Sequence, residues 1–260
     1  MLLSDKDELE QFLRKNTALN IYQIGDLDDF YWENTKWYGL KENGSLKAVT
    51  LLYKAPPFHV LLALSPENEI EPLKELLHSL FEYLPDKFYS HLSPGLESVF
   101  CSYYNLESHG NYQKMILASS SKLNDTSLSG IVSLSSKDIN EIFNLYKESY
   151  PENSFDPRMI ETGMYFGYRF KNKLICISGI HVYSERYRVA ALGNITTHPE
   201  YRGKGYGQKV TAHLCKELFK KVSTIGLNVG QDNIPAIKCY TNIGFTYAAP
   251  YLEYMIEKKS

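Results

Sequence analysis

The glycine-rich run from Arg202 to Gln208 has the residue types needed to bind a phosphorylated ligand. Glycines at 203, 205 and 207 leave backbone N–H groups accessible, because no Cβ shields them. The sequence predicts a helix directly after the loop, from about 206 to 222. The unpaired N–H groups and positive dipole end of such a helix attract anions. Arg202 and Lys204 add two positive charges that suit phosphate oxygens. The loop is therefore predicted to bind a pyrophosphate.

Three alternatives compete for this loop. A Rossmann fingerprint would place a glycine three residues after Gly205, where the chain has Gln208. A Walker loop would continue from lysine to serine or threonine, but Lys204 is followed by Gly205. A glycine-rich connection without a ligand is the third alternative, since short glycine motifs often occur by chance.

The elements around the loop follow from periodicity and from capping residues. A helix with one apolar face is predicted over 137–149, and strands over 164–170, 174–183 and 187–197. After the loop and its helix, a short buried strand is predicted over 224–229. Asp232 or Asn233 can cap the next helix, Gly244 ends it, and a last strand follows over 245–256. The loop thus joins a strand to a helix, as a phosphate site requires.

Two linked motifs in this half resemble the GNAT superfamily of N-acetyltransferases. The run from Ile195 to Gly207 resembles the acyl-CoA motif of that superfamily. Downstream, Leu227-Asn228-Val229 followed by Asn233, Ala236, Tyr240 and Gly244-Phe245 resembles its second motif, in the same order and spacing. The resemblance covers about residues 131–257. It implies an α+β fold with a mixed, mostly antiparallel sheet, helices on both faces and a V-shaped opening between the central strands.

The resemblance also implies a role for each matching residue. Acetyl-CoA would be the cofactor, with CoA as product. The strand residues would bind the pantetheine arm, and the loop would bind the pyrophosphate. Asn233 would contact the arm, with Ala236 leaving room beside it. Tyr240 would protonate the departing thiolate. The cofactor-binding residues implied are Ile195, Thr196, Thr197, Arg202, Gly203, Lys204, Gly205, Tyr206, Gly207, Gln208, Asn233 and Ala236.

The general base is not specified by this pattern. Some members of the superfamily carry glutamate where this chain has Asn228, and an amide cannot take a proton at neutral pH. His181, Glu185 and His198 are substitutes, and a water relay is a further alternative. Cys239 beside Tyr240 would suit an acyl-cysteine route, but a small apolar role fits it better.

The first half carries no recognisable catalytic motif. A Ser/Asn/Asp/Gly-rich stretch over 119–130 predicts a linker between residues 1–118 and a catalytic domain over 131–260. The segment from Leu19 to Leu27 resembles the N-terminal half of predicted acyltransferases in which a degenerate GNAT-like half precedes the catalytic one. We therefore expect residues 1–118 to be a reduced copy of the same layout.

The bulk composition, 43% hydrophobic and 22% charged residues, is that of a globular protein. A net charge of −2 gives no drive toward nucleic acid or an anionic membrane, so neither is an expected partner. No signal peptide or spanning segment is predicted. The four cysteines are far apart, which predicts no metal site and a cytoplasmic location.

The sequence therefore predicts an N-acetyltransferase that moves an acetyl or other acyl group to a primary amine by direct attack in a ternary complex. A small molecule or an amino acid is the expected acceptor, since glycine N-acyltransferases share the two-part plan. Asn228 motivates one alternative, a non-catalytic acyl-CoA sensor. A protein-interaction module with a vestigial loop is another. The acceptor's identity, the acyl length and the oligomeric state do not follow from the sequence.

Overall fold

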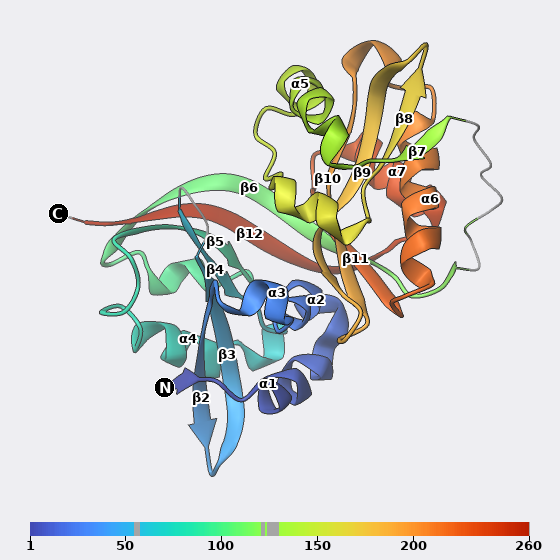
Figure 1. The fold of residues 1–260 in the computed structure, drawn as a ribbon. Coiled ribbons are helices and arrows are strands. Elements are labelled where there is room, and N and C mark those ends of the chain that lie inside the picture. Colours follow the sequence, from blue (N-terminus) through green and yellow to red (C-terminus); the bar gives the residue numbers. More distant parts are fainter. Residues whose placement is uncertain (55–57, 121–122, 124–129, 260) are drawn as a thin grey trace. The chain divides into compact units, whose positions relative to one another are not determined.

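The computed structural model describes residues 1–54, 58–120, 123 and 130–259 (Figure 1). The chain forms two compact units. Unit 1 comprises Met1–Lys114, Gly230–Asp232 and Ala248–Ser260, and unit 2 comprises Met115–Val229 and Asn233–Tyr247. Most of the predicted linker, 119–130, lies outside the described residues. The predicted domains 1–118 and 131–260 differ from these units mainly at the C-terminus.

Unit 2 is built on an antiparallel sheet that contains one parallel pair. Its strands run in the order β7-β8-β9-β10-β11, and only β10 and β11 are parallel. Helix α6 makes the crossover that a parallel pair requires. The elements in chain order are β7 (Ile131–Ser133), α5 (Ile139–Ser149), β8 (Phe166–Phe170), β9 (Lys173–Ser184), β10 (Val189–Thr197), α6 (Tyr206–Phe219), β11 (Thr224–Gly230) and α7 (Ile234–Ile243).

Helices cover both faces of this sheet, as the resemblance implies: α5 lies on one face, and α6 and α7 lie on the other (Figure 1). Helix α6 buries an apolar stripe of residues spaced by four, with Val210, Leu214 and Leu218 fully inaccessible to solvent. Gly244 ends α7 in the left-handed conformation, with φ of 114°, and this confirms the predicted stop.

Unit 1 repeats this order of elements. Its strands run β1-β2-β3-β4-β5-β12, with β4 and β5 parallel and joined through α4. The elements are β1 (Leu2–Leu3), α1 (Lys6–Leu13), α2 (Thr17–Gly25), α3 (Asp29–Trp32), β2 (Thr35–Glu42), β3 (Ser45–Tyr53), β4 (His59–Ala63), α4 (Ile70–His78), β5 (Lys87–Leu92), β6 (Tyr104–Leu117) and the second part of β12 (Thr246–Lys258). The order β2-β3-β4-α4-β5 matches β8-β9-β10-α6-β11, which confirms a GNAT-like copy.

The last strand explains why the units differ from the predicted domains. Strand β12 pairs with β5 in antiparallel register from Leu252 opposite Leu92 to Glu257 opposite Lys87. Residues 248–260 therefore belong to unit 1, although the sequence assigns them to the catalytic domain. Their ladder of hydrogen bonds completes the sheet of the first unit.

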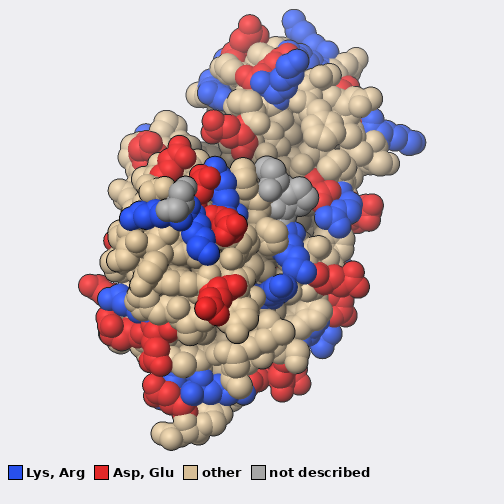
Figure 2. Space-filling view, turned by 90° about the vertical axis from the view of Figure 1, so that its left-hand side faces the viewer, with Lys and Arg blue, Asp and Glu red and all other residues tan. Residues whose placement is uncertain are grey.

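The surface charge is mixed. On the face shown in Figure 2, acidic and basic side chains are interspersed, as expected for a net charge of −2. In the described part of the chain, no helix is both long and apolar enough to span a membrane. Within the same residues, no cluster of histidine, cysteine and acidic side chains could hold a metal ion.

Candidate functional site

The parallel pair of unit 2 opens partway along its length. Strands β10 and β11 pair only from Val189 opposite Thr224 to Leu192 opposite Leu227, although the strands continue to Thr197 and Gly230. Beyond Leu192 the described residues show no further pairing between them. The β10 backbone at 193–197 can therefore offer hydrogen bonds to a ligand in the opening. This is the V-shaped opening that the resemblance implies.

A bulge in β10 marks the start of the opening. The register with β9 shifts between Gly193 and Thr196, and Asn194 has a φ of 55°. Asn194 is buried, and three hydrogen bonds fix its position. The hydroxyl of Tyr146 donates to its carbonyl oxygen (2.8 Å), its Nδ2 donates to Tyr165 Oη (3.0 Å), and its Oδ1 accepts from the Ser154 amide (3.2 Å). These bonds fix a left-handed backbone conformation that is uncommon for residues other than glycine and that asparagine adopts more readily than most.

The bond from Tyr146 to the bulge gives a testable prediction. Tyr146→Phe leaves the buried carbonyl of Asn194 without this donor, and we expect the free energy of unfolding of the protein to fall by about 1–2 kcal/mol. Urea denaturation measures the change. Tyr168→Phe is the matched control, because its ring stacks on Tyr206 (centroids 4.7 Å apart) and its change should stay within about 0.5 kcal/mol. Equal stability of the two variants would contradict a structural role for this hydrogen bond.

The glycine loop is held to the end of β10 by Arg202. Its Nε donates to Thr197 O and its Nη2 donates to Ser149 O, both at 3.0 Å. The guanidinium thus fixes the loop against β10 and the end of α5, besides placing a positive charge beside it. Lys204 Nζ donates to Glu200 O (3.1 Å) on the exposed side of the loop.

The loop glycines have conformations and surroundings that a side chain would disturb. Gly203 and Gly205 have φ of 74° and 79°, and a Cβ at either position would point into open space. A Cβ on Gly207 would lie 3.2 Å from Thr197 Oγ1, so α6 begins close against β10. Open space beside two left-handed glycines is the cradle that a phosphate group needs.

The first turn of α6 faces this cradle with unused amides. Gly205 is the N-cap and has no side chain to cap the helix. The amide of Lys209 donates to Gly205 O at 3.2 Å, so the amides of 206–208 have no helical acceptor. Three N–H groups and the helix dipole therefore lie beside the loop, and cofactor binding by Tyr206, Gly207 and Gln208 stays a prediction.

Helix α7 carries the other predicted residues. Asn233 caps the helix, with Oδ1 accepting from the Ala236 amide (3.2 Å). Tyr240 is only 9% exposed, and its hydroxyl has no hydrogen-bond partner among the described residues. Burial, and then the nearby Cys239 and Tyr150, raise the pKa of Tyr240 above its usual value. The phenol therefore keeps its proton at neutral pH.

The three base candidates have different surroundings. The ring of His181 lies directly over Gly193, where a Cβ would be 1.8 Å from its Cδ2, so it sits at the bulge. Glu185 is exposed and accepts from Tyr183 (2.7 Å) and Lys221 (3.3 Å), which lower its pKa.

His198 is buried, with Nε2 3.0 Å from Glu148 Oε2 and 3.2 Å from Lys173 Nζ. These partners tie His198 to α5 and to the start of β9. Of the three candidates, His181 is the one placed against the bulge.

The cysteines of unit 2 lack the character of a nucleophile. Burial raises the pKa of Cys239 to about 11 and that of Cys176 to about 12. Both therefore remain neutral thiols at physiological pH, and a thiol is a poor nucleophile. The geometry gives no support to an acyl-cysteine route.

Sequence reasoning missed Asn194 and the tyrosines that hold it. One signal was available, since Gly193 interrupts an otherwise apolar strand, and an isolated glycine in a strand often marks a bulge. Nothing in the sequence connected Tyr146 and Tyr165 to that position, because the contacts span 48 and 29 residues.

Comparison with known proteins places this site in a family. Residues 137–245 match the acetyltransferase (GNAT) family. The [Ribosomal protein bS18]-alanine N-acetyltransferase of Escherichia coli K12 is 40% identical over 60 residues, which are 23% of this chain and 40% of that protein. The match thus spans less than half the length of that relative.

Solved structures share the two-unit architecture. A protein of the GNAT family from Novosphingobium aromaticivorans superposes with a TM-score of 0.64 at 16% identity, covering 94% of this chain and 98% of that one. A tandem GNAT protein from the clavulanic acid biosynthesis pathway gives a TM-score of 0.56 at 12% identity, covering 98% and 97%. At these identities the likeness shows the fold.

Proposed function

Because residues 137–245 form a domain of the acetyltransferase (GNAT) family, we propose that this protein is an N-acetyltransferase that uses acetyl-CoA to acylate a primary amine. One observation carries the proposal. The parallel pair of unit 2 opens beyond Leu192, and β10 then leads directly into a glycine loop at the start of α6.

The residues around the opening suit the parts of acetyl-CoA. The 206–208 amides and the glycine cradle suit a pyrophosphate, with Lys204 as a nearby cation. The β10 backbone at Ile195, Thr196 and Thr197 suits the amides of a pantetheine arm. Asn233 and Ala236, in the first turn of α7, would lie along that arm. When bound, acetyl-CoA supplies an activated thioester, and its thiol, with an ordinary pKa of about 8.5, is a good leaving group.

Residues of this chain would then polarise the thioester carbonyl, protonate the departing sulfur and take a proton from the acceptor amine. A β10 amide beyond the bulge would bind the carbonyl oxygen as negative charge develops there, which is often the largest catalytic contribution. Tyr240 would donate its proton to the departing sulfur. His181, against the bulge at Gly193, is our choice of base to take the proton released by the acceptor amine.

The acceptor that we propose is the primary amine of a small molecule or an amino acid. The name of the Escherichia coli relative describes an alanine of a ribosomal protein as its acceptor, which motivates a second candidate, the N-terminal amine of a protein. A test panel should therefore contain free amino acids, simple amines and peptides that begin with alanine.

Titration calorimetry with acetyl-CoA and CoA, followed by a thiol-release assay with this panel, tests the proposal. We expect micromolar binding of both nucleotides and amine-dependent release of thiol. Tight binding without thiol release for any amine would instead support the acyl-CoA sensor. Absence of binding by the folded protein would refute both functions.

A further inference from the structure

His198 is buried where β10 ends and the turn into the glycine loop begins. It directly precedes Pro199–Tyr201, a short turn that leads into Arg202. Its φ of −49° and ψ of 135° are the extended values expected before a proline. Its amide donates to Ile175 O at 2.8 Å. The backbone of His198 is thus fixed to β9 at the point where the chain enters the loop.

The ring of His198 caps this turn as a hydrogen-bond acceptor. The amide of Glu200 donates to Nδ1 at 3.3 Å. A ring nitrogen that accepts from an N–H group carries no proton, so the neutral ring has its proton on Nε2. Nε2 lies 3.0 Å from Glu148 Oε2, and this carboxylate oxygen is therefore the acceptor of that proton. The cap exists only while the imidazole is neutral.

The peptide group that His198 caps is also bonded to the lysine of the loop. Lys204 Nζ donates to Glu200 O at 3.1 Å, and the same ammonium group lies 5.1 Å from the centroid of the Tyr201 ring. Contacts therefore run from His198 through the Glu200 peptide to Lys204, the cation proposed to lie near the pyrophosphate. The position of this charge depends on the turn that His198 caps.

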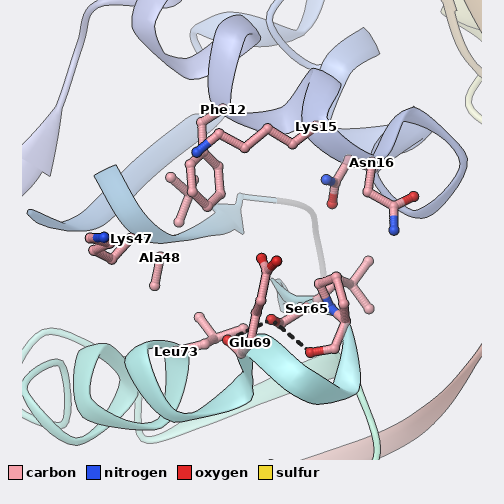
Figure 3. A pocket seen from close by; sticks show the side chains of 12 residues that line it. Phe12, Lys15, Asn16, Lys47, Ala48, Ser65, Glu69 and Leu73 are labelled. Atoms are coloured by element: carbon pink, nitrogen blue, oxygen red, sulfur yellow. Dashed lines mark hydrogen bonds between the residues drawn. The ribbon is translucent and has the colours of Figure 1, made fainter. Parts of the chain in front are cut away.

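The corresponding turn of unit 1 lacks this cap. Strand β4 leads into Ser65-Pro66 and a short turn, Glu67–Glu69, which has no side-chain cap. The hydroxyl of Ser65 instead donates to Glu69 O at 2.9 Å, beside a small pocket (Figure 3). No glycine lies between β4 and α4. The histidine cap is therefore found in the unit that has the glycine loop and not at the matching turn of the other unit.

Charged and titratable groups from three elements face the ring of His198. Glu148 comes from α5 and Lys173 from β9, with Lys173 Nζ 3.2 Å from Nε2. Tyr201, from the turn itself, has its ring centroid 5.5 Å away in an edge-to-face arrangement. Histidine is the side chain whose charge ordinarily changes between about pH 5 and 8. A proton on Nδ1 would replace the acceptor by a second donor facing the Glu200 amide, and the cap would be lost.

We propose that His198 is a positioning residue for acetyl-CoA binding. The neutral ring caps the turn and holds the loop and Lys204 in place for the pyrophosphate, and the protonated ring releases them. The cap is present at the higher pH and lost as the pH falls, so the affinity for acetyl-CoA falls with it. This inference rests on the proposed function, because acetyl-CoA is the ligand concerned.

The location of the ring proton can be measured without a ligand. In ¹⁵N-labelled full-length protein at about pH 8, a long-range ¹H–¹⁵N spectrum should show His198 with an unprotonated Nδ1 and a protonated Nε2. The signals are assigned by their absence from the spectrum of His198→Asn. A proton on Nδ1 at this pH would overturn the proposal, whatever the protein binds.

Calorimetric titration with acetyl-CoA at about pH 8 and about pH 5.5 measures the coupling to binding. Asparagine caps helical turns and does not titrate, so His198→Asn should bind like the wild type at the higher pH. Between the two pH values the wild type should lose about fivefold more affinity than this variant, as expected for a lost helix cap. The comparison cancels the titration of the phosphates of the nucleotide, which affects both proteins. His213→Asn, the same change on α6, is the matched control and should keep the wild-type pH dependence.

The possible outcomes separate this inference from the proposed function. Equal pH dependence of the wild type and His198→Asn would overturn the inference. So would wild-type binding that strengthens at the lower pH relative to the variant, because His198 would then act as a cation toward the phosphates. Absence of acetyl-CoA binding in all three proteins, with the ring proton on Nε2, would reject the proposed function and with it any role of His198 in that function.

Discussion

Replacing Gly205 with glutamate is expected to abolish acetyl-CoA binding, with an affinity at least 100-fold below that of the wild type. Gly205 has a φ of 79° and caps α6, and a residue with a Cβ pays about 1–2 kcal/mol in this conformation. The new carboxylate would also stand beside the proposed pyrophosphate. Two unit charges about 4 Å apart repel by about 4 kcal/mol near a protein surface. Titration calorimetry and the thiol-release assay both measure the effect.

Gly44→Glu separates backbone strain from electrostatic repulsion. Gly44 lies in the turn between β2 and β3 with a φ of 77°, and a Cβ there would meet nothing within 4 Å, as at Gly205. The control should lose a similar amount of stability but bind acetyl-CoA normally. Undiminished turnover by Gly205→Glu would show that the cofactor does not use this loop.

The glycine loop was predictable because the residues that would form the phosphate site are adjacent in the sequence. Gly203 and Gly205 adopt left-handed conformations, and a helix follows at once, so the motif contains nearly everything that the phosphate site requires. The apolar stripe of α6 and the stop at Gly244 were predictable for the same reason. Residues within one or two helical turns of each other report directly on their local structure.

Features that depend on distant partners were not predictable. The alternation along β12 indicates a strand, but it does not say that Leu252 faces Leu92 of β5. The sequence presents Asn20 as an ordinary helix residue, and only the fold shows that its side chain is buried and that its Nδ2 donates to Leu13 O. The general base also needs three-dimensional information, since His181 acquires its position through Gly193 on the neighbouring strand.

Replacing Tyr240 with phenylalanine is expected to lower kcat by about 10²-fold, the lower end of the range for a general acid. KM for acetyl-CoA should change little, because the proton is needed only as the carbon–sulfur bond breaks. The hydroxyl has no protein partner among the described residues, so removing it breaks no structural hydrogen bond. The melting temperature should therefore stay close to that of the wild type. Tyr247→Phe, at an exposed position in the same unit, is the control and should keep full activity.

The pH dependence distinguishes an acid from a packing role for Tyr240. Burial raises its pKa, so the folded protein keeps the phenol protonated at pH values where an ordinary tyrosine, with a pKa of about 10, would lose its proton. The wild-type kcat should then show no alkaline decline from this group up to about pH 10. In Tyr240→Phe the thiolate must leave unprotonated or take its proton from water, and the deficit should persist across the whole range. An unchanged kcat, or a loss that follows a lower melting temperature, would assign Tyr240 to the core and leave protonation of the thiolate to solvent.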